Sequence, residues 1–316
     1  MKIIVAGGTG FLGRALVTAL SRQGHEVLVL SRRPDSSGAS FSSSVHTIGW
    51  DASWPGPWTE SFSSVDAVIN LAGEPIANGR WTRTRKETIR SSRICATRGI
   101  VDALRVHSTK PCTLVNASGI GYYGPSQGEI VQETAEPGSG FLADLCVEWE
   151  REACRAEALG VRVVRLRIGM VLEKDGGALP RMMVPFKLFV GGPMLPGDQW
   201  ISWIHRADLI RLIEWVLVTP SVAGAVNAVA PDPVPMSRFC SVLGEVLHRP
   251  SWLPVPEWAL KTGLGELGSL MTTGQRVMPT VPCVRPSHGS LTYPANGNAS
   301  SRSNSSAAAR INRPTS

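Results

Sequence analysis

Long hydrophobic runs are missing from this sequence, and charged residues are few. Only 18% of the 316 residues are charged, against 43% that are apolar, and the mean hydropathy is +0.02. This balance is typical of a folded globular chain and excludes an intrinsically disordered one. No apolar stretch reaches the roughly 18 residues that a membrane-spanning helix needs. We therefore expect a globular protein with no membrane partner.

A targeting signal is also missing. Met1 is followed at once by the short apolar run 2–6 and then by a glycine loop. This leaves no room for the charged segment, the longer apolar segment and the cleavage site that make up a signal peptide. We therefore expect neither a signal peptide nor a transit peptide, and we predict a cytoplasmic protein.

The cysteines follow no redox or metal-binding pattern. None of the six forms a C-x-x-C pair, and none stands at zinc-ligand spacing from a histidine. We therefore predict free thiols in a reducing compartment, and no metal site.

Acidic residues and lysine are absent from the end of the chain. Residues 280–316 contain four arginines, one aromatic residue (Tyr293) and low-complexity Ser and Ala runs. Nucleic-acid-binding proteins instead cluster basic residues on one face of a domain, so we expect no nucleic-acid partner. This atypical tail has no face to bury, and we predict that it is disordered from about Pro294. An altered reading frame or a splicing difference would explain its composition.

The first part of the chain alternates between two hydrophobic periods, which predicts an α/β fold. Parallel strands covered by helices on both faces produce this alternation, and right-handed crossovers make the sheet doubly wound. We predict a Rossmann-type domain over 1–175 and a smaller, mainly helical substrate-side domain over 176–279. In the first domain, strands are expected at 2–6, 25–30, 45–50, 67–71, 112–117 and 161–167, and helices at 11–22, 82–107 and 141–159; in the second, helices are expected at 207–218, 237–247 and 257–273.

A glycine loop separates the first predicted strand from the first predicted helix. In such loops one glycine permits the tight turn, one lets the backbone approach a pyrophosphate, and one lets the helix pack on the sheet. The helix N-terminus then offers free N–H groups to the phosphates. The position between a strand and a helix supports a dinucleotide site over a plain tight turn, formed by Gly7, Thr9, Gly10, Phe11, Leu12 and Gly13.

Cofactor choice is predicted at the end of the second strand. NAD-binding proteins place an acidic residue there to hold the ribose hydroxyls, but this chain has Ser31-Arg32-Arg33. A guanidinium can grip a 2′-phosphate through two hydrogen bonds. We therefore predict NADP(H) as the cofactor, with Ser31 and Arg32 as its clamp, over a solvated pair of surface arginines.

These motifs resemble the extended short-chain dehydrogenase/reductases of the epimerase/dehydratase class. The resemblance rests on the glycine loop, on Asn70-Leu71-Ala72-Gly73, on Ser118 in the segment 117–124, and on the segment 167–172. Further motifs, at 70–76, 79–82, 203–205 and 274–277, resemble the atypical "epimerase family protein" group, and the resemblance extends to about residue 279. It implies contacts with NADP(H) from Ser31, Arg32, Leu71, Ala72, Arg93 and Val171, and it adds Gly73, Glu74 and Arg167 to the expected cofactor site.

The chain departs from the larger family at the catalytic residues. Ordinary members carry a Tyr-x-x-x-Lys pair on the helix after the serine strand, where the lysine lowers the pKa of the tyrosine. Aligning Glu150 with the family's glutamate places Leu142 at the tyrosine position and Cys146 at the lysine position. The usual proton-transfer pair is therefore missing.

Three residues remain as catalytic candidates, each with a structural alternative. Ser118 could orient a carbonyl group or could satisfy loop backbone at the strand end. Tyr122 could donate a proton or pack in a pocket wall. His205 could act as an acid or base, since histidine titrates near neutrality, or could be a packing residue. Glu74 is a further acid candidate or a solvated loop carboxylate, and Asp208 is expected to complement the dipole of a helix start.

Two functions follow from these observations. The first is an NADP(H)-dependent oxidoreductase or epimerase-like enzyme acting on an unknown small molecule. The second is a non-catalytic NADPH-binding sensor or regulatory protein, which the missing tyrosine and lysine favour. The fold alone cannot choose between them, and the sequence indicates neither the substrate nor the oligomeric state.

Overall fold

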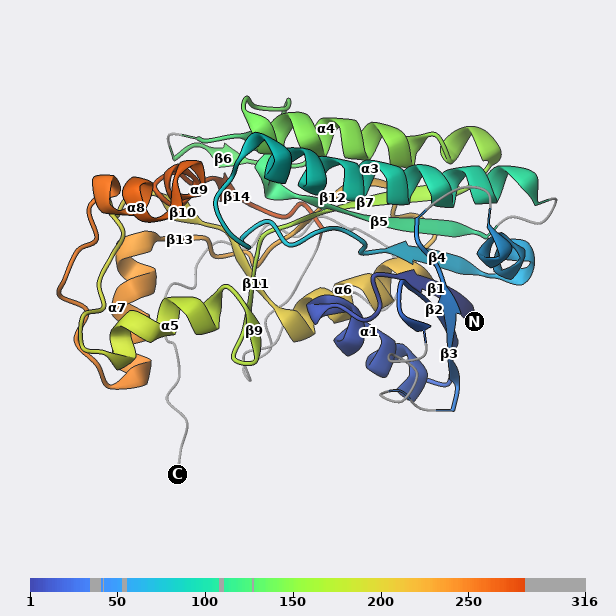
Figure 1. Cartoon of the computed structure of the whole chain (residues 1–316), viewed down its shortest axis with the longest axis horizontal. Helices are drawn as coiled ribbons and strands as arrows, with labels where there is room; N and C mark the ends of the chain where they lie inside the picture. Colours follow the sequence, from blue (N-terminus) through green and yellow to red (C-terminus); the bar gives the residue numbers. More distant parts are fainter. Residues whose placement is uncertain (35–40, 42, 53–55, 108–110, 127, 282–316) are drawn as a thin grey trace.

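The computed structural model describes residues 1–34, 41, 43–52, 56–107, 111–126 and 128–281. Its centre is a parallel sheet of seven strands in the order β12-β7-β5-β4-β1-β2-β3 (Figure 1). Every neighbouring pair in this sheet runs parallel, as the alternating pattern predicted. The strands are β1 (Lys2–Ala6), β2 (Glu26–Ser31), β3 (Val45–Gly49), β4 (Ala67–Asn70), β5 (Thr113–Gly119), β7 (Arg162–Ile168) and β12 (Gly224–Ala228).

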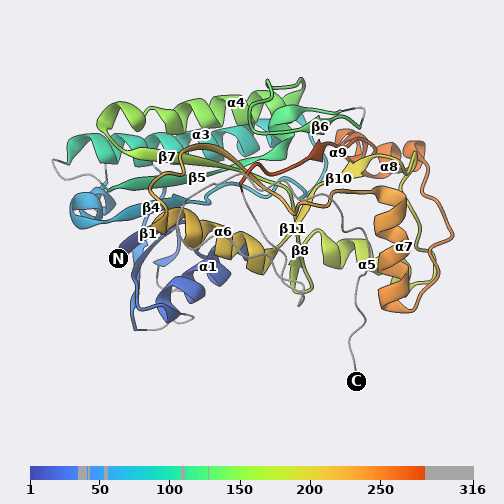
Figure 2. The same cartoon turned by 180° about the vertical axis from the view of Figure 1, so that it is seen from behind.

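Helices cover both faces of this sheet. Helices α1 (Phe11–Arg22) and α6 (Arg206–Val218) lie on one face, and α3 (Arg83–Val106) and α4 (Phe141–Cys154) lie on the other (Figures 1 and 2). Successive side chains of β1 point to opposite faces of the sheet: Ile3 is buried in the cluster with α1 and α6, and Ile4 in the cluster with α3. A strand that is buried on both faces must be apolar throughout, which explains the apolar run in β1. The parallel strand order and the two covered faces confirm the predicted Rossmann-type fold.

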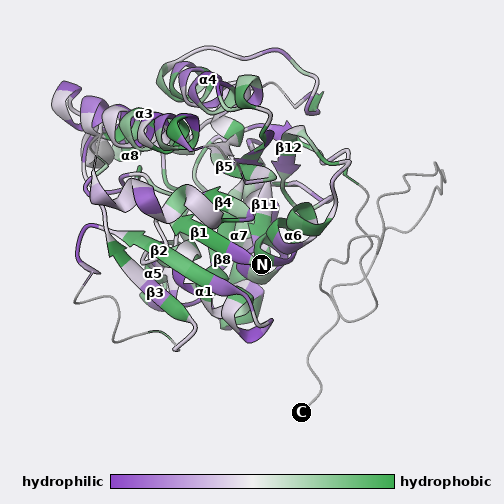
Figure 3. Ribbon diagram, turned by 90° about the vertical axis from the view of Figure 1, so that its right-hand side faces the viewer, coloured by the Kyte–Doolittle hydropathy of each residue, from purple (hydrophilic) through white to green (hydrophobic). Residues whose placement is uncertain are grey.

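Hydropathy follows this layering. Figure 3 shows β1, β2 and β4 as hydrophobic strands, whereas α3 carries hydrophilic residues along its outer side. Helix α3 buries Ile89, Ile100 and Leu104, the last two in the cluster with β1 and β4, and leaves Arg83, Glu87 and Arg90 exposed. Only one stripe of this helix therefore contributes to the core.

The strand order reverses between β1 and β4. Chain connections leave this point in opposite directions, and in open α/β sheets such a reversal is where ligands bind, in a crevice at the carboxyl ends of the two strands. The glycine loop follows β1 there, and the segment Leu71–Glu74 follows β4. The topology thus brings together two motifs that lie about sixty residues apart in the sequence.

A smaller, mostly helical region faces the carboxyl edge of the sheet, at the left of Figure 1. Short strands link its helices to the central layer. The helices are α5 (Leu179–Lys187), α7 (Met236–Leu247), α8 (Glu257–Leu264) and α9 (Glu266–Met271); the strands are β6 (Ile130–Val131), β8 (Met170–Glu173), β9 (Gly176–Gly177), β10 (Trp200–Ile201), β11 (Trp203–His205), β13 (Val234–Pro235) and β14 (Arg276–Val277). The 3₁₀ turns follow elements of the central region instead: η1 (Pro57–Ser64) follows β3, η2 (Ile120–Tyr123) follows β5 and η3 (Glu157–Leu159) follows α4.

The chain crosses between the two regions more often than a boundary at residue 175 predicts. Helix α6 packs on α1, and β12 pairs with β7 as the edge strand of the central sheet. Residues 206–228 therefore return to the first layer, because Val226 and Ala228 find their apolar surroundings only beside β7. Two expected helices also differ in extent. The helix expected at 141–159 stops at Cys154, and the one expected at 257–273 is divided in two at Gly265, whose φ is +63°.

Part of the predictions falls outside the described residues. The disorder expected in the tail concerns mainly residues 282–316, about which the structure makes no statement. Among the described residues, no helix is both long and apolar enough to cross a membrane.

The return of β12 to the sheet can be tested by stability measurements. Val226 is 2% exposed in the core, whereas Val218 on α6 is 68% exposed. We expect Val226→Ala to lower the free energy of unfolding by about 2 kcal/mol, through lost burial and a residual cavity. Val218→Ala should change it by less than about 0.5 kcal/mol. Urea unfolding followed by circular dichroism measures both, and equal effects would contradict the assignment.

Candidate nucleotide site and its buried polar network

The glycine loop is held so closely that side chains do not fit. A Cβ atom on Gly7, whose φ is +77°, would lie 2.7 Å from the carbonyl carbon of Leu71. A Cβ atom on Gly13 would lie 2.2 Å from the carbonyl oxygen of Gly7. The loop thus presses its backbone against both the exit of β4 and the first turn of α1.

Helix α1 begins at this loop without a side-chain cap. Its N-cap is Gly10, which offers no side-chain acceptor, and the first turn contains no acidic residue. The first N–H groups of a helix have no partners within the helix, and here they start at the open edge of the sheet. Together with the glycine cradle, this arrangement fits a pyrophosphate.

The end of β2 presents the predicted phosphate clamp. Ser31 is buried, and its Oγ accepts a hydrogen bond from the backbone N–H of Arg33 at 3.1 Å. The side chains of Arg32 and Arg33 are exposed beside it. Two guanidinium groups thus stand where an NAD-binding protein carries a carboxylate, and these residues fit a ribose that bears a 2′-phosphate.

A hairpin that the sequence reasoning missed covers the other side of the glycine loop. Strands β8 and β9 place Gly176 against the ring of Phe11. A Cβ atom on Gly176 would lie only 2.5 Å from Cδ2 of that ring, so a side chain does not fit there. The guanidinium of Arg206 lies 5.1 Å from the centre of the same ring and pairs with Asp175 at 2.7 Å. Val171 belongs to this hairpin. Only the glycines at 176 and 177 hinted at the close approach.

The segment after β4 is shaped by buried amides. The side chain of Asn70 donates to Thr97 Oγ1 (2.9 Å) and Asn116 Oδ1 (2.7 Å) and accepts from the N–H of Ala72 (3.2 Å). These bonds fix the course of Leu71, Ala72 and Gly73 past the glycine loop. The Asn at the end of β4 is therefore a structural anchor for predicted cofactor contacts.

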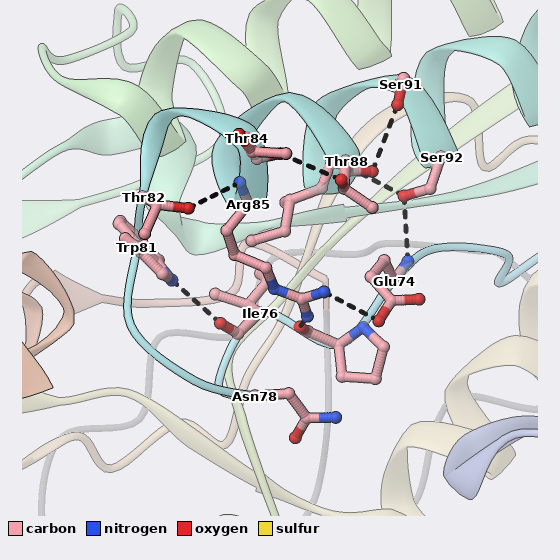
Figure 4. Close-up of polar contacts among 12 residues, drawn as sticks. Glu74, Ile76, Asn78, Trp81, Thr82, Thr84, Arg85, Thr88, Ser91 and Ser92 are labelled. Carbon is pink, nitrogen blue, oxygen red and sulfur yellow. Dashed lines mark hydrogen bonds and ion pairs between the residues drawn. The ribbon is translucent and has the colours of Figure 1, made fainter.

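Glu74 is braced against α3, as Figure 4 shows. Its backbone N–H donates to Ser92 Oγ at 3.0 Å, and its carboxylate accepts from Arg85 Nη1 at 3.0 Å. Arg85 also donates to the carbonyl oxygen of Pro75. The guanidinium thus ties the β4–α3 loop to the helix, and Glu74 is an ion-paired carboxylate rather than a freely solvated one.

Arg93 lies behind the same segment with unused donors. It is 8% exposed, donates Nη1–H to the carbonyl oxygens of Glu74 (3.0 Å) and Ile89 (3.1 Å), and stacks on Trp149. Burial lowers its pKa to about 10, and its Nε has no partner among the described residues. A Cβ atom on Gly73 would lie 2.9 Å from its Cζ. This orphaned donor fits an acceptor that a bound nucleotide would supply.

Ser118 belongs to a buried polar network. Its Oγ–H donates to Glu150 Oε1 at 2.7 Å, and Glu150 receives two further bonds at 2.9 Å from Nε and Nη2 of Arg167. Ser118, Glu150 and Arg167 are 5%, 3% and 3% exposed. Burial by itself lowers the pKa of the Arg167 guanidinium. The hydrogen bonds to Glu150 and its negative charge have the larger combined effect, so the pKa is raised.

Tyr122 and Tyr123 complete this network on the other side of Arg167. The guanidinium lies 3.4 Å above the centre of the Tyr122 ring, and its Nη1 donates to Tyr123 Oη at 2.9 Å. Tyr123 in turn donates to Asn227 Oδ1 at 2.6 Å. Arg167, predicted as a cofactor contact, thus directs its donors at protein partners, and Ser118 and Tyr122 are brought together through it.

His205 lies apart from the other two catalytic candidates. It is the N-cap of α6, where its Nδ1 accepts from the N–H of Ala207 at 3.2 Å. Its half-exposed ring lies 3.9 Å from Glu173 on the β8–β9 hairpin. Asp208 stands in the first turn of α6, as expected, and pairs with Arg211 at 2.8 Å.

Leu142 and Cys146, which the alignment on Glu150 places at the tyrosine and lysine positions of the family, lie close to the end of β5. A Cβ atom on Gly121 would be 3.0 Å from Leu142 Cβ, and one on Gly119 would be 3.8 Å from Cys146 Sγ. Burial raises the pKa of the Cys146 thiol to about 11. These positions next to Ser118 therefore carry an apolar group and a neutral thiol. No cluster of metal-binding side chains occurs among the described residues.

Comparison with known proteins agrees with this architecture. The profile of the NAD dependent epimerase/dehydratase family matches residues 3–228. The chain belongs to this family. A second profile, a domain of unknown function called DUF1731, matches residues 255–281.

Family members with similar sequences come from plants and bacteria. The chain is 42% identical to "Epimerase family protein SDR39U1 homolog, chloroplastic" of Arabidopsis thaliana, over 88% of this chain and 80% of the relative. It is 40% identical to "Epimerase family protein YfhF" of Bacillus subtilis, over 88% and 90%. These relatives confirm the resemblance to the atypical group.

Solved structures of family members share the fold. Human epimerase family protein SDR39U1, crystallised with NADPH, superposes with a TM-score of 0.77 at 33% identity, over 88% of this chain and 91% of that chain. A nucleoside-diphosphate sugar epimerase from Corynebacterium glutamicum gives 0.69 at 31% identity, over 88% and 53%. UDP-glucuronic acid 4-epimerase of Bacillus cereus, at 17% identity and a TM-score of 0.70, shows the fold alone.

The buried ion pair between Glu150 and Arg167 should make a large contribution to the free energy of unfolding. We expect Glu150→Gln to lower the free energy of unfolding by about 3–5 kcal/mol, because it leaves Arg167 as an uncompensated buried charge. The matched control is Glu148→Gln on the same helix, which breaks a partly exposed pair with Arg90 and should cost less than about 1 kcal/mol. Thermal and urea unfolding measure both. Similar small losses would show that the pair is dispensable.

Proposed function

We propose that this protein binds NADP(H) in the crevice between β1 and β4. One observation carries the proposal: the uncapped glycine loop at β1 adjoins a β2 end that presents Ser31, Arg32 and Arg33 in place of a carboxylate. The NADPH in the structure of the human relative supports the same choice. The NAD named for more distant proteins of this fold does not argue against it, because those chains share only the fold.

The neighbouring residues would hold the rest of the cofactor. Leu71, Ala72 and Gly73 would line its path beside the glycine loop, and Arg93 would offer its unused donors behind Gly73. Val171 would cover it from the β8–β9 hairpin, and Phe11 from the start of α1. When bound, NADP(H) supplies a hydride or accepts one, and the protein contributes binding, orientation and electrostatics.

We propose an oxidoreductase or epimerase-like reaction on a small molecule, with the substrate on the side of the smaller region. Ser118 and Tyr122 are its candidate catalytic residues, because η2 follows β5 directly at the carboxyl edge of the sheet. Glu74 is a further candidate acid, oriented by Arg85. His205 is the weaker choice, since its Nδ1 is engaged in capping α6.

Cofactor preference is directly measurable. We expect NADPH to bind more tightly than NADH, and Arg32→Ala to reduce NADPH binding by about 1.5–3 kcal/mol while NADH binding stays the same, since only the 2′-phosphate contact is lost. Isothermal titration calorimetry of both nucleotides on both proteins measures this. Equal affinities in the wild type would overturn the proposed cofactor.

One observation favours the second candidate function, an NADPH-binding sensor without turnover. The Ser118 hydroxyl proton is committed to Glu150, and the neighbouring positions on α4 carry Leu142 and Cys146, neither of which transfers protons near neutrality. A serine that must break a charged hydrogen bond to reach a substrate is a poor proton donor.

A substrate screen separates the two candidates. For an enzyme, we expect substrate-dependent NADPH oxidation that falls at least about tenfold in Ser118→Ala or Tyr122→Phe, as the loss of a positioned proton donor costs. The same variants should keep their NADPH affinity. Tight NADPH binding with no turnover across a library of carbonyl compounds and sugar nucleotides would support the sensor instead.

A further inference from the structure

A third arginine lies at the nucleotide-facing end of α1, and none of the predicted contacts includes it. Arg14 follows the last glycine of the loop and is exposed. Its Nε–H donates to the carbonyl oxygen of Thr9 at 2.9 Å. This bond ties the guanidinium of Arg14 to the glycine loop. It engages Nε alone and not the two terminal nitrogens of the guanidinium.

Among the described residues, Arg14 has no anionic partner. In the part of the chain that the structure describes, no carboxylate lies within ion-pair distance of it, and the first turn of α1 holds no acidic residue. A positive charge near a helix N-terminus is opposed by the helix dipole. Its position is therefore electrostatically unfavourable unless an anion joins it.

The loop that holds Arg14 lies directly on β2. A Cβ atom on Gly8 would be 2.8 Å from Cγ1 of Val29, and Ala6 pairs with Leu30 in the sheet. Ser31 and Arg32 follow at once along β2. The Thr9 carbonyl that anchors Arg14 therefore follows β1 at the same carboxyl edge of the sheet at which β2 ends.

We propose that Arg14 is a second specificity-determining arginine, which grips the 2′-phosphate of NADP(H) from the α1 side while Arg32 grips it from the β2 side. The inference rests on the proposed NADP(H) function and deepens it. Two guanidinium groups would balance the charge of one dianionic phosphate. A bound phosphate would also lock the loop through the Thr9 bond.

The variant Arg14→Gln isolates this role. The Nε2 of glutamine occupies the place of the arginine Nε, so the bond to Thr9 can persist while the charged tip is removed. The matched control is Arg22→Gln, an exposed arginine in the last turn of the same helix. The probes are 2′,5′-ADP, which carries the 2′-phosphate, and 5′-AMP, which lacks it. Circular dichroism confirms that each variant is folded.

We expect Arg14→Gln to weaken 2′,5′-ADP binding about tenfold, as the loss of a charge-assisted bond does, and to leave 5′-AMP binding and the Arg22→Gln control unchanged. Equal weakening of both probes would show that Arg14 only orders the loop and would overturn the inference. No effect of Arg14→Gln, with a strong effect of Arg32→Ala, would overturn it while leaving the proposed function intact. A wild-type protein that binds both probes equally would overturn the proposed cofactor itself.

Discussion

The nucleotide site depends on the close approach of Gly7 to the backbone of Leu71, where a Cβ atom on Gly7 would lie 2.7 Å from the carbonyl carbon. This contact joins the exits of β1 and β4 at the point where the strand order reverses. It sets how near the glycine loop, the start of α1 and the Leu71–Glu74 segment stand to one another. The crevice, its phosphate-facing helix start and its cover by the β8–β9 hairpin all depend on that spacing.

A second set of contacts defines what the site can do. Ordinary relatives use the helix after the serine strand for proton transfer, whereas here the same helix supplies Glu150 to a buried pair with Arg167. Glu150 of that pair accepts the hydrogen bond of the Ser118 hydroxyl, and the guanidinium of Arg167 lies over the face of the Tyr122 ring. Low local dielectric makes such a fully satisfied network rigid. Chemistry at this site would therefore require Ser118 to leave a strong partner, which is why a binding role competes with a catalytic one.

Binding and catalysis are thus supported unequally. The nucleotide side has a steric cradle, free helix N–H groups, an orphaned donor on Arg93 and a cluster of arginines, which are independent observations that agree. The reaction side has candidate residues divided between two places, with Ser118 and Tyr122 on the buried network and His205 at the start of α6. Glu74 follows β4 and is held by Arg85. Membership of the family identifies the fold, but the reaction has to be inferred from the residues of the site.

Much of the fold was open to prediction because its signals are local. The range Phe11–Arg22 was predicted to the residue, since a glycine loop precedes it and an apolar stripe runs through it; the early strands are equally clear as short buried apolar runs. Gly265 was harder to interpret, because only its positive φ reveals that one helix becomes two. The return of 206–228 to the central sheet was missed, because an edge strand carries no mark of its partner.

The sequence by itself determined the Rossmann-type fold, the glycine loop, the Ser31-Arg32-Arg33 segment in place of a carboxylate at the end of β2, and the absence of a Tyr-x-x-x-Lys pattern, because each depends on residue type and spacing along the chain. Only the tertiary structure decided that Arg167 serves Glu150, that Arg93 lies buried with a spare donor and that Phe11 is covered by Gly176. Those facts depend on which side chains meet across elements that lie far apart in the sequence, and side-chain direction at a crossing is a property of packing.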